Sequence, residues 1–334
     1  MAYQNVTMRP MDSPAAPPHA DVPPVDRRAL PAGAVVDCPA MADGWPVRRL
    51  RLPAAAGAAH RGALLFMGGR ADFIEKYLDA IVHWAGRGWH VTAFDWRGQG
   101  GSGRLLPDRQ VGHIEDFGLW IDDLAAIATA WRADAPAGPH VAVAHSMGGH
   151  LLLRALVERR IALDAAVMLS PMFGLNGGLV PAWLGEALAS AMCRLGLGRR
   201  AAWPDSPASY ARMTRLTHDP AHFADELWWR ESDSALAQGA PSWRWLQQAY
   251  RSTRMLAASP ALGAMAVPSL ILGTVADQLV LPAAIARVVA RLPDADVHLY
   301  GGEAAHELLR EGDAVRLDAL GRIDAFLDAR APVR

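Results

Sequence analysis

The sequence has few cysteines and no long hydrophobic segment. Its two cysteines, Cys38 and Cys193, lie far apart in the 334 residues and form no CxxC pair or other metal-ligand spacing. Small disulfide-stabilised folds and structural zinc sites need several cysteines, so both classes are excluded. Although 51% of the residues are hydrophobic, no apolar run reaches the roughly 18 residues that a membrane-spanning helix needs. We therefore expect a protein of the reducing cytoplasm.

A surplus of charge of one sign is also missing. The formal net charge is −1 and the pI is near 6.9, whereas sequence-independent binding of nucleic acid depends on uncompensated Lys and Arg. We therefore expect no nucleic-acid partner. Lys76 is the only lysine among 33 basic residues, but the preference for arginine indicates no function by itself.

The first 32 residues are rich in proline and have no apolar periodicity. Such a segment cannot bury enough surface to offset the entropy lost on ordering, so residues 1–32 are predicted to be a mobile tail. The same segment lacks the order of basic, apolar and small residues that a secretory signal requires. This again favours the cytoplasm.

From Trp45 onward, short apolar segments alternate with helical patterns. Strands are expected at residues 63–67, 90–95, 141–144, 165–169, 269–272 and 297–300, and helices at 73–84, 117–131, 147–157, near 282–291 and 315–327. Strands that alternate with helices of this length indicate βαβ units. The predicted fold class is α/β, with a mostly parallel central sheet flanked by helices.

Between residues 171 and 259 the alternation stops and helical segments joined by Gly and Pro follow. This pattern predicts an inserted helical cap, with the α/β core formed by residues 33–170 and 260–334. The cap contains half of the 12 tryptophans: Trp183, Trp203, Trp228, Trp229, Trp243 and Trp245. Six exposed indoles would present on the order of 1,200 Å², which is more than a soluble monomer normally exposes. Most of them should be covered by the core, a ligand or a membrane surface.

The strongest local motif is VAVAHSMGG at residues 141–149, an apolar strand that runs through Ser146 into a Leu-rich helix. A serine between a strand and a helix, with small residues two positions to each side, is typical of a nucleophile elbow. Ala144 and Gly148 supply the small residues, although Ala stands where Gly is usual. A serine that merely caps a helix is the alternative interpretation.

A serine nucleophile needs a base, and in hydrolases with such an elbow the order along the chain is Ser, then Asp or Glu, then His. His306 lies in a Gly-rich loop after the strand at 297–300, the end of a parallel strand where reactive groups gather. His298 lies within that strand, and His218 and His222 belong to the inserted segment. His306 is therefore the predicted base.

The orienting acid is predicted at Asp277, directly after an apolar strand. Asp294 and Asp296 precede a strand and so belong to the opposite edge of the sheet. Glu303 is close to His306 in sequence and is the second candidate. Ser146, Asp277 and His306 thus form the predicted catalytic triad.

A competing motif lies at residues 98–103, where GQGGSG fits the GxGxxG pattern of dinucleotide-binding proteins. That fingerprint requires a helix to begin at once beneath the pyrophosphate. Here Pro107 and Gly112 follow, and no helical pattern begins before Phe117. A P-loop is missing too, so we expect neither a cofactor nor a metal.

Together these segments resemble the lysophospholipase and monoacylglycerol lipase group of α/β-hydrolases, over roughly residues 45–327. The resemblance rests on FMGGRADFIEKY at 66–77, FDWRGQGGSGR at 94–104, AHSMGG at 144–149, DQLV at 277–280 and AHELL at 305–309. It implies Ser146 as nucleophile, His306 as base, Asp277 as orienter and a helical cap between two core strands. Many relatives have His-Gly where Met67 and Gly68 stand here. We place the oxyanion hole at the backbone N–H groups of Gly69 and Met147.

The resemblance implies a serine hydrolase that cleaves carboxylic esters of lipids, either lysophospholipids or monoacylglycerols, through an acyl-enzyme. The partner would be a small acyl ester or lipid, with peripheral membrane contact through the cap; the oligomeric state is left open. A small-ester esterase and a non-catalytic binding protein on the same scaffold are alternatives. A peptidase or amidase is another, since it would need an anchor for a charged terminus and the cap has acidic candidates: Glu186, Asp225, Glu226, Glu231 and Asp233.

Overall fold

A computed structural model describes residues 25–178, 180–204 and 210–332. Their centre is an eight-stranded sheet in the order β1-β2-β4-β3-β5-β6-β7-β8. The strands are β1 (Val35–Asp37), β2 (Arg49–Leu52), β3 (Gly62–Met67), β4 (Trp89–Phe94), β5 (His140–His145), β6 (Ala165–Leu169), β7 (Ser269–Thr274) and β8 (Ala295–Tyr300). The pairs from β4 to β8 are parallel, whereas β1 and β2 add antiparallel at one edge. The predicted fold class is confirmed.

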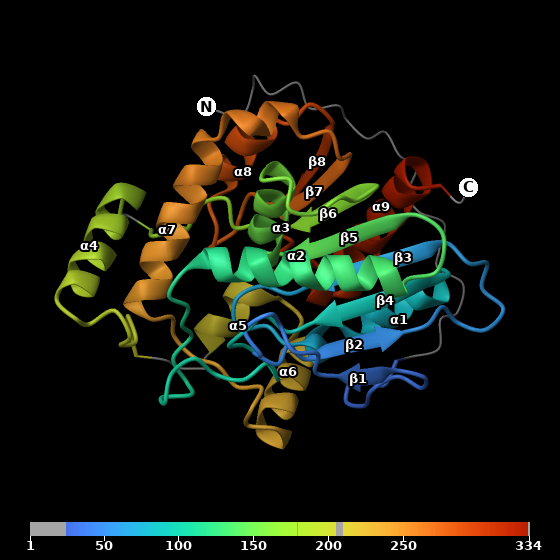
Figure 1. Ribbon diagram of the computed structural model, residues 1–334, viewed down its shortest axis with the longest axis horizontal. Helices are drawn as coiled ribbons and strands as arrows, with labels where there is room; N and C mark the ends of the chain where they lie inside the picture. Colours follow the sequence, from blue (N-terminus) through green and yellow to red (C-terminus); the bar gives the residue numbers. More distant parts are fainter. Residues whose placement is uncertain (1–24, 179, 205–209, 333–334) are drawn as a thin grey trace.

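Helices cover both faces of this sheet. The α-helices are α1 (Leu78–Gly86), α2 (Phe117–Asp134), α3 (Met147–Val157), α4 (Ala182–Arg194), α5 (Tyr210–Leu216), α6 (Pro220–Ser232), α7 (Trp243–Ala258), α8 (Pro282–Val289) and α9 (Asp313–Arg330). The described residues also form the short 3-10 helices η1 (Ile74–Tyr77), η2 (Pro260–Ala264) and η3 (Leu308–Arg310). In Figure 1, α2 and α3 lie in front of the sheet and α1 and α9 behind it.

The core consists of two layers, one on each face. Along β3, Leu65 and Met67 pack into the layer under α2, α3 and α8, while Leu64 and Phe66 pack into the layer under α1 and α9. Successive side chains of a strand point to opposite faces, so a strand covered on both sides is apolar at every position. This is why the central strands read as continuous apolar runs.

One predicted helix, at residues 73–84, is divided in the structure. Its first turn is η1, and only from Leu78 does the chain continue as α1. Asp95 accepts the N–H of Ile74 in a 2.9 Å hydrogen bond, and all four residues of η1 are buried. The tighter turn brings Glu75 and Lys76 inside, where their charges have partners, and an amphipathic helical pattern could not indicate that.

The segment between β6 and β7 contains α4 to α7. Figure 1 shows α4 at the periphery, beside α7, whereas α6 lies at another edge of the molecule. Of the six tryptophans here, Trp245 is buried, Trp228, Trp229 and Trp243 are half-buried, and Trp183 and Trp203 are exposed. Among the helices of the described residues, none combines the length and the hydropathy needed to cross a bilayer.

Residues 1–24 of the predicted tail lie outside the described residues. The described remainder contacts α6: Arg27 and Arg28 both bond Asp225, at 2.7 Å and 2.8 Å. The indole N–H of Trp229 also donates to the carbonyl oxygen of Arg27 at 2.8 Å. This part of the chain is therefore attached to α6.

Candidate active site

Ser146 occupies the sharp turn between β5 and α3. Its backbone has φ 52° and ψ −116°, a conformation that L-residues rarely adopt, and its side chain makes no capping bond to α3. The turn is held by the bond from Ser146 N–H to the Leu169 carbonyl, at 2.8 Å, and by Met172 N–H to the Ser146 carbonyl, at 2.9 Å. The hydroxyl is thereby left available to a partner outside the helix.

Small residues around Ser146 are required by close backbone contacts. A Cβ on Gly148 would lie 2.5 Å from the carbonyl oxygen of Gly68, and one on Gly69 would lie 2.8 Å from the Cβ of Ser146. Both distances are shorter than van der Waals contact allows. The loop after β3 and the start of α3 can approach each other only because both positions are glycine.

The structure brings the three predicted triad residues together. His306 Nε2 lies 2.8 Å from Ser146 Oγ, and His306 Nδ1 lies 2.7 Å from Asp277 Oδ2. The other oxygen of Asp277 accepts the N–H groups of Leu279 at 2.8 Å and Val280 at 3.0 Å, which fixes the carboxylate. The three residues follow the carboxyl ends of β5, β7 and β8, which lie at the same end of the parallel strands.

The electrostatics of the site favour a histidine that holds a proton well. Burial acts to lower the pKa of His306, but the charge of Asp277 and its hydrogen bond outweigh burial and raise that pKa. Burial acts in the opposite sense on Asp277, yet the charge and hydrogen bond of His306 lower its pKa. Asp277 therefore stays ionised and stabilises the imidazolium form of His306.

The rejected histidines have other partners. His222 bonds Asp79 at 3.0 Å and Asp219 at 2.8 Å, and His298 packs its ring on that of Tyr300. The exposed ring of His218 lies 3.4 Å from Glu311.

The alternative acids have other partners too. The second candidate acid, Glu303, is exposed and accepts the N–H of Gly301. Asp294 and Asp296 pair with Arg330. The geometry thus distinguishes Asp277 and His306 from each of their alternatives.

The two predicted oxyanion-hole residues flank Ser146 but differ in their backbone bonding. Met147 is the first residue of α3, where N–H groups have no partner within the helix. Gly69 lies against Ser146, but its N–H donates to Asp72 Oδ2 at 2.6 Å. In this conformation the Gly69 N–H is therefore directed at a carboxylate of the protein.

Sequence reasoning missed a buried polar cluster beside the triad. Asp72 Oδ2 accepts the hydroxyl of Tyr77 at 2.8 Å and lies 3.0 Å from His145 Nδ1, while Lys76 Nζ lies 2.5 Å from Asp72 Oδ1. Glu307, which follows His306, accepts from Lys76 at 2.7 Å. The solitary lysine was the one signal in the sequence that pointed here.

The Gly-rich motif at residues 98–103 encloses an internal carboxylate. Asp95 accepts the N–H of Gly101 at 2.8 Å, and a Cβ on Gly100 would lie 2.3 Å from the carboxyl carbon of Asp95. Burial raises the pKa of Asp95 to about 6 against the opposing charge of Arg48. The glycines therefore serve the packing of a core acid.

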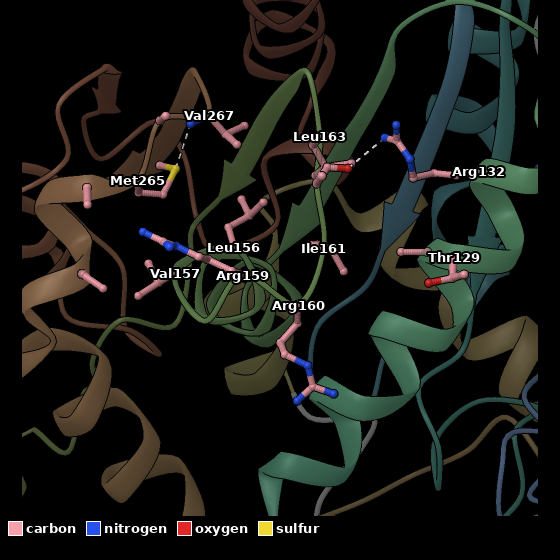
Figure 2. Close-up of a pocket in the computed structure, with 15 residues that line it drawn as sticks. Thr129, Arg132, Leu156, Val157, Arg159, Arg160, Ile161, Leu163, Met265 and Val267 are labelled. Carbon is pink, nitrogen blue, oxygen red and sulfur yellow. Dashed lines mark hydrogen bonds between the residues drawn. The ribbon is translucent and has the colours of Figure 1, made fainter.

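A cavity of about 620 Å³ lies far from Ser146. Figure 2 shows its lining, which includes Thr129 and Arg132 of α2 and Leu156 and Val157 of α3. Ser146 precedes α3, whereas this cavity is at the end of its 11 residues, about 16 Å away at 1.5 Å per residue. The cavity is not part of the candidate active site.

An eight-stranded, mostly parallel sheet with a strained serine, a histidine and an aspartate at the ends of three strands defines a serine hydrolase of the α/β-hydrolase fold. Residues 58–313 match the family described as serine aminopeptidase, S33, and the chain belongs to this family.

Known relatives agree with that class. Lysophospholipase L2 of Escherichia coli is 29% identical over 304 residues, covering 86% of this chain and 85% of the relative. Probable lysophospholipase L2 of Haemophilus influenzae is 26% identical over 278 residues, covering 82% and 86%. The predicted group, an ester hydrolase of the lysophospholipase and monoacylglycerol lipase type, is confirmed at the level of family and enzyme class.

Solved structures share the fold. A soluble variant of monoglyceride lipase from Saccharomyces cerevisiae superposes with a TM-score of 0.74 at 19% identity, covering 93% of this chain and 99% of the other. The monoacylglycerol lipase of Paleococcus ferrophilus gives 0.67 at 19% identity, covering 85% and 99%.

Proposed function

We propose that this protein hydrolyses carboxylic esters of lipids, lysophospholipids or monoacylglycerols, through an acyl-enzyme on Ser146. The observation that carries the proposal is the continuous hydrogen-bonded chain from Ser146 through His306 to Asp277. The names of the bacterial relatives support a lysophospholipid, and the structural neighbours support a monoacylglycerol.

The mechanism follows from the contacts of the triad. His306 Nε2 takes the proton of Ser146 Oγ as this oxygen bonds to the acyl carbon, and the charge of Asp277 stabilises the resulting imidazolium. The carbonyl oxygen becomes an oxyanion, for which Met147 N–H is a donor at the start of α3. Gly69 N–H is a second donor once it exchanges Asp72 for the oxyanion. The imidazolium then protonates the leaving alcohol, and water activated by His306 releases the fatty acid.

A fluorophosphonate probe tests the nucleophile. Wild type should be labelled at Ser146, and Ser146→Ala should lose labelling together with hydrolysis of lysophosphatidylcholine, 1-monoacylglycerol and p-nitrophenyl esters. Ser102→Ala is a matched control, because Ser102 is buried and its hydroxyl bonds the backbone of Asp95 and Arg48, not His306. Equal labelling of wild type and Ser146→Ala would overturn the assignment. Tight binding of a lipid without hydrolysis would favour the non-catalytic alternative.

The family description makes a peptidase or amidase the second candidate. A peptidase that binds a free amino terminus needs an unpaired acidic anchor. Of the five candidate carboxylates, Glu231 and Asp233 are exposed, whereas the other three have arginine partners. Glu186 pairs with Arg254, Asp225 with Arg27 and Arg28, and Glu226 with Arg310. These pairings favour an ester without a charged amine. Faster turnover of aminoacyl p-nitroanilides than of the esters would instead favour a peptidase or amidase.

We also propose that the protein works in the cytoplasm at the periphery of a membrane, with α4 against an anionic lipid surface. Trp183 is 71% exposed, Leu188 50% and Leu195 72%, and Leu184 and Val180, which are close to them in sequence, are exposed as well. The arginines nearby, Arg194, Arg199 and Arg200, are exposed. An apolar helix face with basic neighbours suits an interface with anionic headgroups.

Sedimentation with vesicles of phosphatidylglycerol and phosphatidylcholine tests this contact. The double variant Trp183→Ser, Leu188→Ser should bind at least about tenfold more weakly, since each buried apolar side chain contributes roughly 1.5–3 kcal/mol. Leu119→Ser removes an exposed leucine from α2 instead and should bind like wild type. Equal binding by the double variant and wild type would refute a role for α4.

A further inference from the structure

Lys76, the only lysine of the chain, is buried in a cage of three carboxylates. Its Nζ lies 2.5 Å from Asp72, 2.7 Å from Glu307 and 3.3 Å from Glu226, and its side chain is 2% exposed. An uncompensated buried charge is costly, so this ammonium and its three acids depend on each other.

Two of the three carboxylates belong to segments that carry the proposed site. Asp72 binds the N–H of Gly69, which lies against Ser146, and its Oδ2 faces His145, the residue before Ser146. Glu307 directly follows His306. His145 also reaches this loop, because its Nε2 lies 3.3 Å from the carbonyl oxygen of His306. Lys76 thus connects the loop after β3 with the loop that carries His306.

The third carboxylate links the same ammonium to the inserted helices. Glu226 lies in α6 and also pairs with Arg310, at 3.0 Å, and Arg212, at 2.6 Å. Arg310 pairs with Glu307 as well. The backbone of α5 meets the same loop, since Leu216 accepts the N–H of Glu307 at 2.8 Å. One cluster of charges therefore holds the loop after β3, the His306 loop and α6 together.

The choice of lysine has a physical reason. Arginine presents a planar fork, whereas an ammonium is compact and directs three N–H donors to three different acceptors. The chain uses arginine at every other basic position but places a lysine where three carboxylates from separate segments converge.

We propose that Lys76 is a positioning residue for the hydrolytic reaction, fixing the loop of Gly69 and the loop of His306 relative to Ser146. The inference rests on the proposed function. Lys76 itself touches neither substrate nor reacting atoms, and it acts through Asp72 and Glu307. A displacement of about 1 Å in a catalytic group can cost on the order of 100-fold in rate, which sets the scale of the effect.

The test compares Lys76→Met, Lys76→Arg and a control, Arg97→Met, in the full chain. Arg97 is also a buried cation, and its side chain pairs with Asp43 and Asp123, away from the triad segments. Folding is followed by circular dichroism. The kinetic constants kcat and KM are measured with a p-nitrophenyl ester, and the reactivity of the Ser146 hydroxyl is measured as the rate of fluorophosphonate labelling.

In folded Lys76→Met, kcat and the labelling rate should both fall at least about tenfold, with KM changed less than about threefold. Lys76→Arg keeps the charge but should not restore kcat. Arg97→Met should lose thermal stability while its kcat stays within about threefold of wild type.

Wild-type kcat in Lys76→Met at a reduced unfolding temperature would overturn the inference, because the lysine would then only stabilise the fold. If Lys76→Met does not fold, Lys76→Arg is used instead, and wild-type kcat in that variant at a reduced unfolding temperature would overturn the inference. Ser146→Ala is measured in parallel: if it still hydrolyses the ester, the proposed function fails, whereas its inactivity beside fully active Lys76 variants removes only the inference on Lys76.

Discussion

At the scale of single residues, the site depends on close backbone approach around Ser146. The carbonyl oxygen of Gly68 lies 2.5 Å from the place where a Cβ at position 148 would stand, and the φ of 52° at Ser146 already strains the turn. A methyl group at position 148 cannot be accommodated by the movement of a flexible side chain, because the neighbouring atoms belong to the main chain.

Gly148→Ala should therefore reduce kcat by about 100-fold or more and lower the unfolding temperature, since either Ser146 or the loop after β3 must move. Kinetics with a p-nitrophenyl ester and a thermal melt measure both effects. Gly86→Ala, at the end of α1, is the matched control and should keep wild-type kcat, because apart from its own helix backbone and chain neighbours no atom lies within 4 Å of the new Cβ. A Gly148→Ala variant with wild-type kcat would show that the turn tolerates the methyl group.

The raised pKa of His306 gives a second prediction at this scale. The base must be neutral, so kcat/KM should rise with pH through a midpoint above 6.5, the ordinary value for histidine. Asp277→Asn removes the charge that raises the pKa. Its midpoint should move to lower pH, and its kcat should fall by about 10⁴, because the imidazole also loses its orienting acceptor. Profiles of fluorophosphonate labelling against pH for the two proteins measure the shift; coincident midpoints would contradict it.

At the scale of elements, a buried histidine joins α3, which begins at the site, to α7. His150 Nε2 lies 2.7 Å from Ser252 Oγ of α7, and burial, helped by Arg154, lowers the pKa of His150 to about 3. The folded protein therefore keeps this ring neutral under conditions in which an unfolded chain would protonate it.

Stability should fall as the pH drops from about 6.5 toward 3, because over that range only the unfolded state binds the proton of His150. At pH 5 the His150 contribution to the loss is about 2 kcal/mol, from 1.36 kcal/mol per pH unit. Urea unfolding at pH 7 and pH 5 should show a loss smaller by this amount in His150→Gln. His60→Gln, at an exposed position, should lose as much as wild type. Equal losses of stability between pH 7 and pH 5 in wild type and His150→Gln would show that His150 is not the group responsible.

At the scale of the whole molecule, a segment near the amino terminus is attached to α6. Arg27 and Arg28 share the carboxylate of Asp225, and the pairs are partly exposed, with side-chain exposures of 32%, 46% and 15%. Ion pairs at such positions contribute up to about 1 kcal/mol each, so they hold the segment in place more than they stabilise the fold.

Asp225→Ala should therefore speed cleavage by trypsin after Arg27 and Arg28 several-fold, while the free energy of unfolding falls by only about 1 kcal/mol. Mass spectrometry of timed digests and urea unfolding measure these effects. Asp122→Ala removes a comparable surface pair with Arg160 and should leave cleavage at these two sites unchanged. Unchanged cleavage in Asp225→Ala would indicate that other contacts hold the segment.

Much of the core could be predicted because its signals are local. Apolar runs gave β3, β5 and β6 within a residue or two, and α3 and β6 have the predicted bounds. The triad could also be placed, since nucleophile, acid and base each follow a predicted strand and parallel strands present their carboxyl ends at one edge. The division of residues 73–84 into η1 and α1 could not be predicted, because it depends on the buried partner Asp95.

The sequence by itself determined the fold class and the triad candidates Ser146, Asp277 and His306, in that order along the chain. It could do so because hydrophobic periodicity and small residues at a sharp turn are properties of short segments. Only the tertiary structure decided how Lys76 and the Gly69 N–H are used. Lys76 and Glu307 are 231 positions apart, and no local pattern specifies which charges will meet in the interior. Their pairing follows from the cost of burying a charge alone, a cost that arises only when the chain is folded.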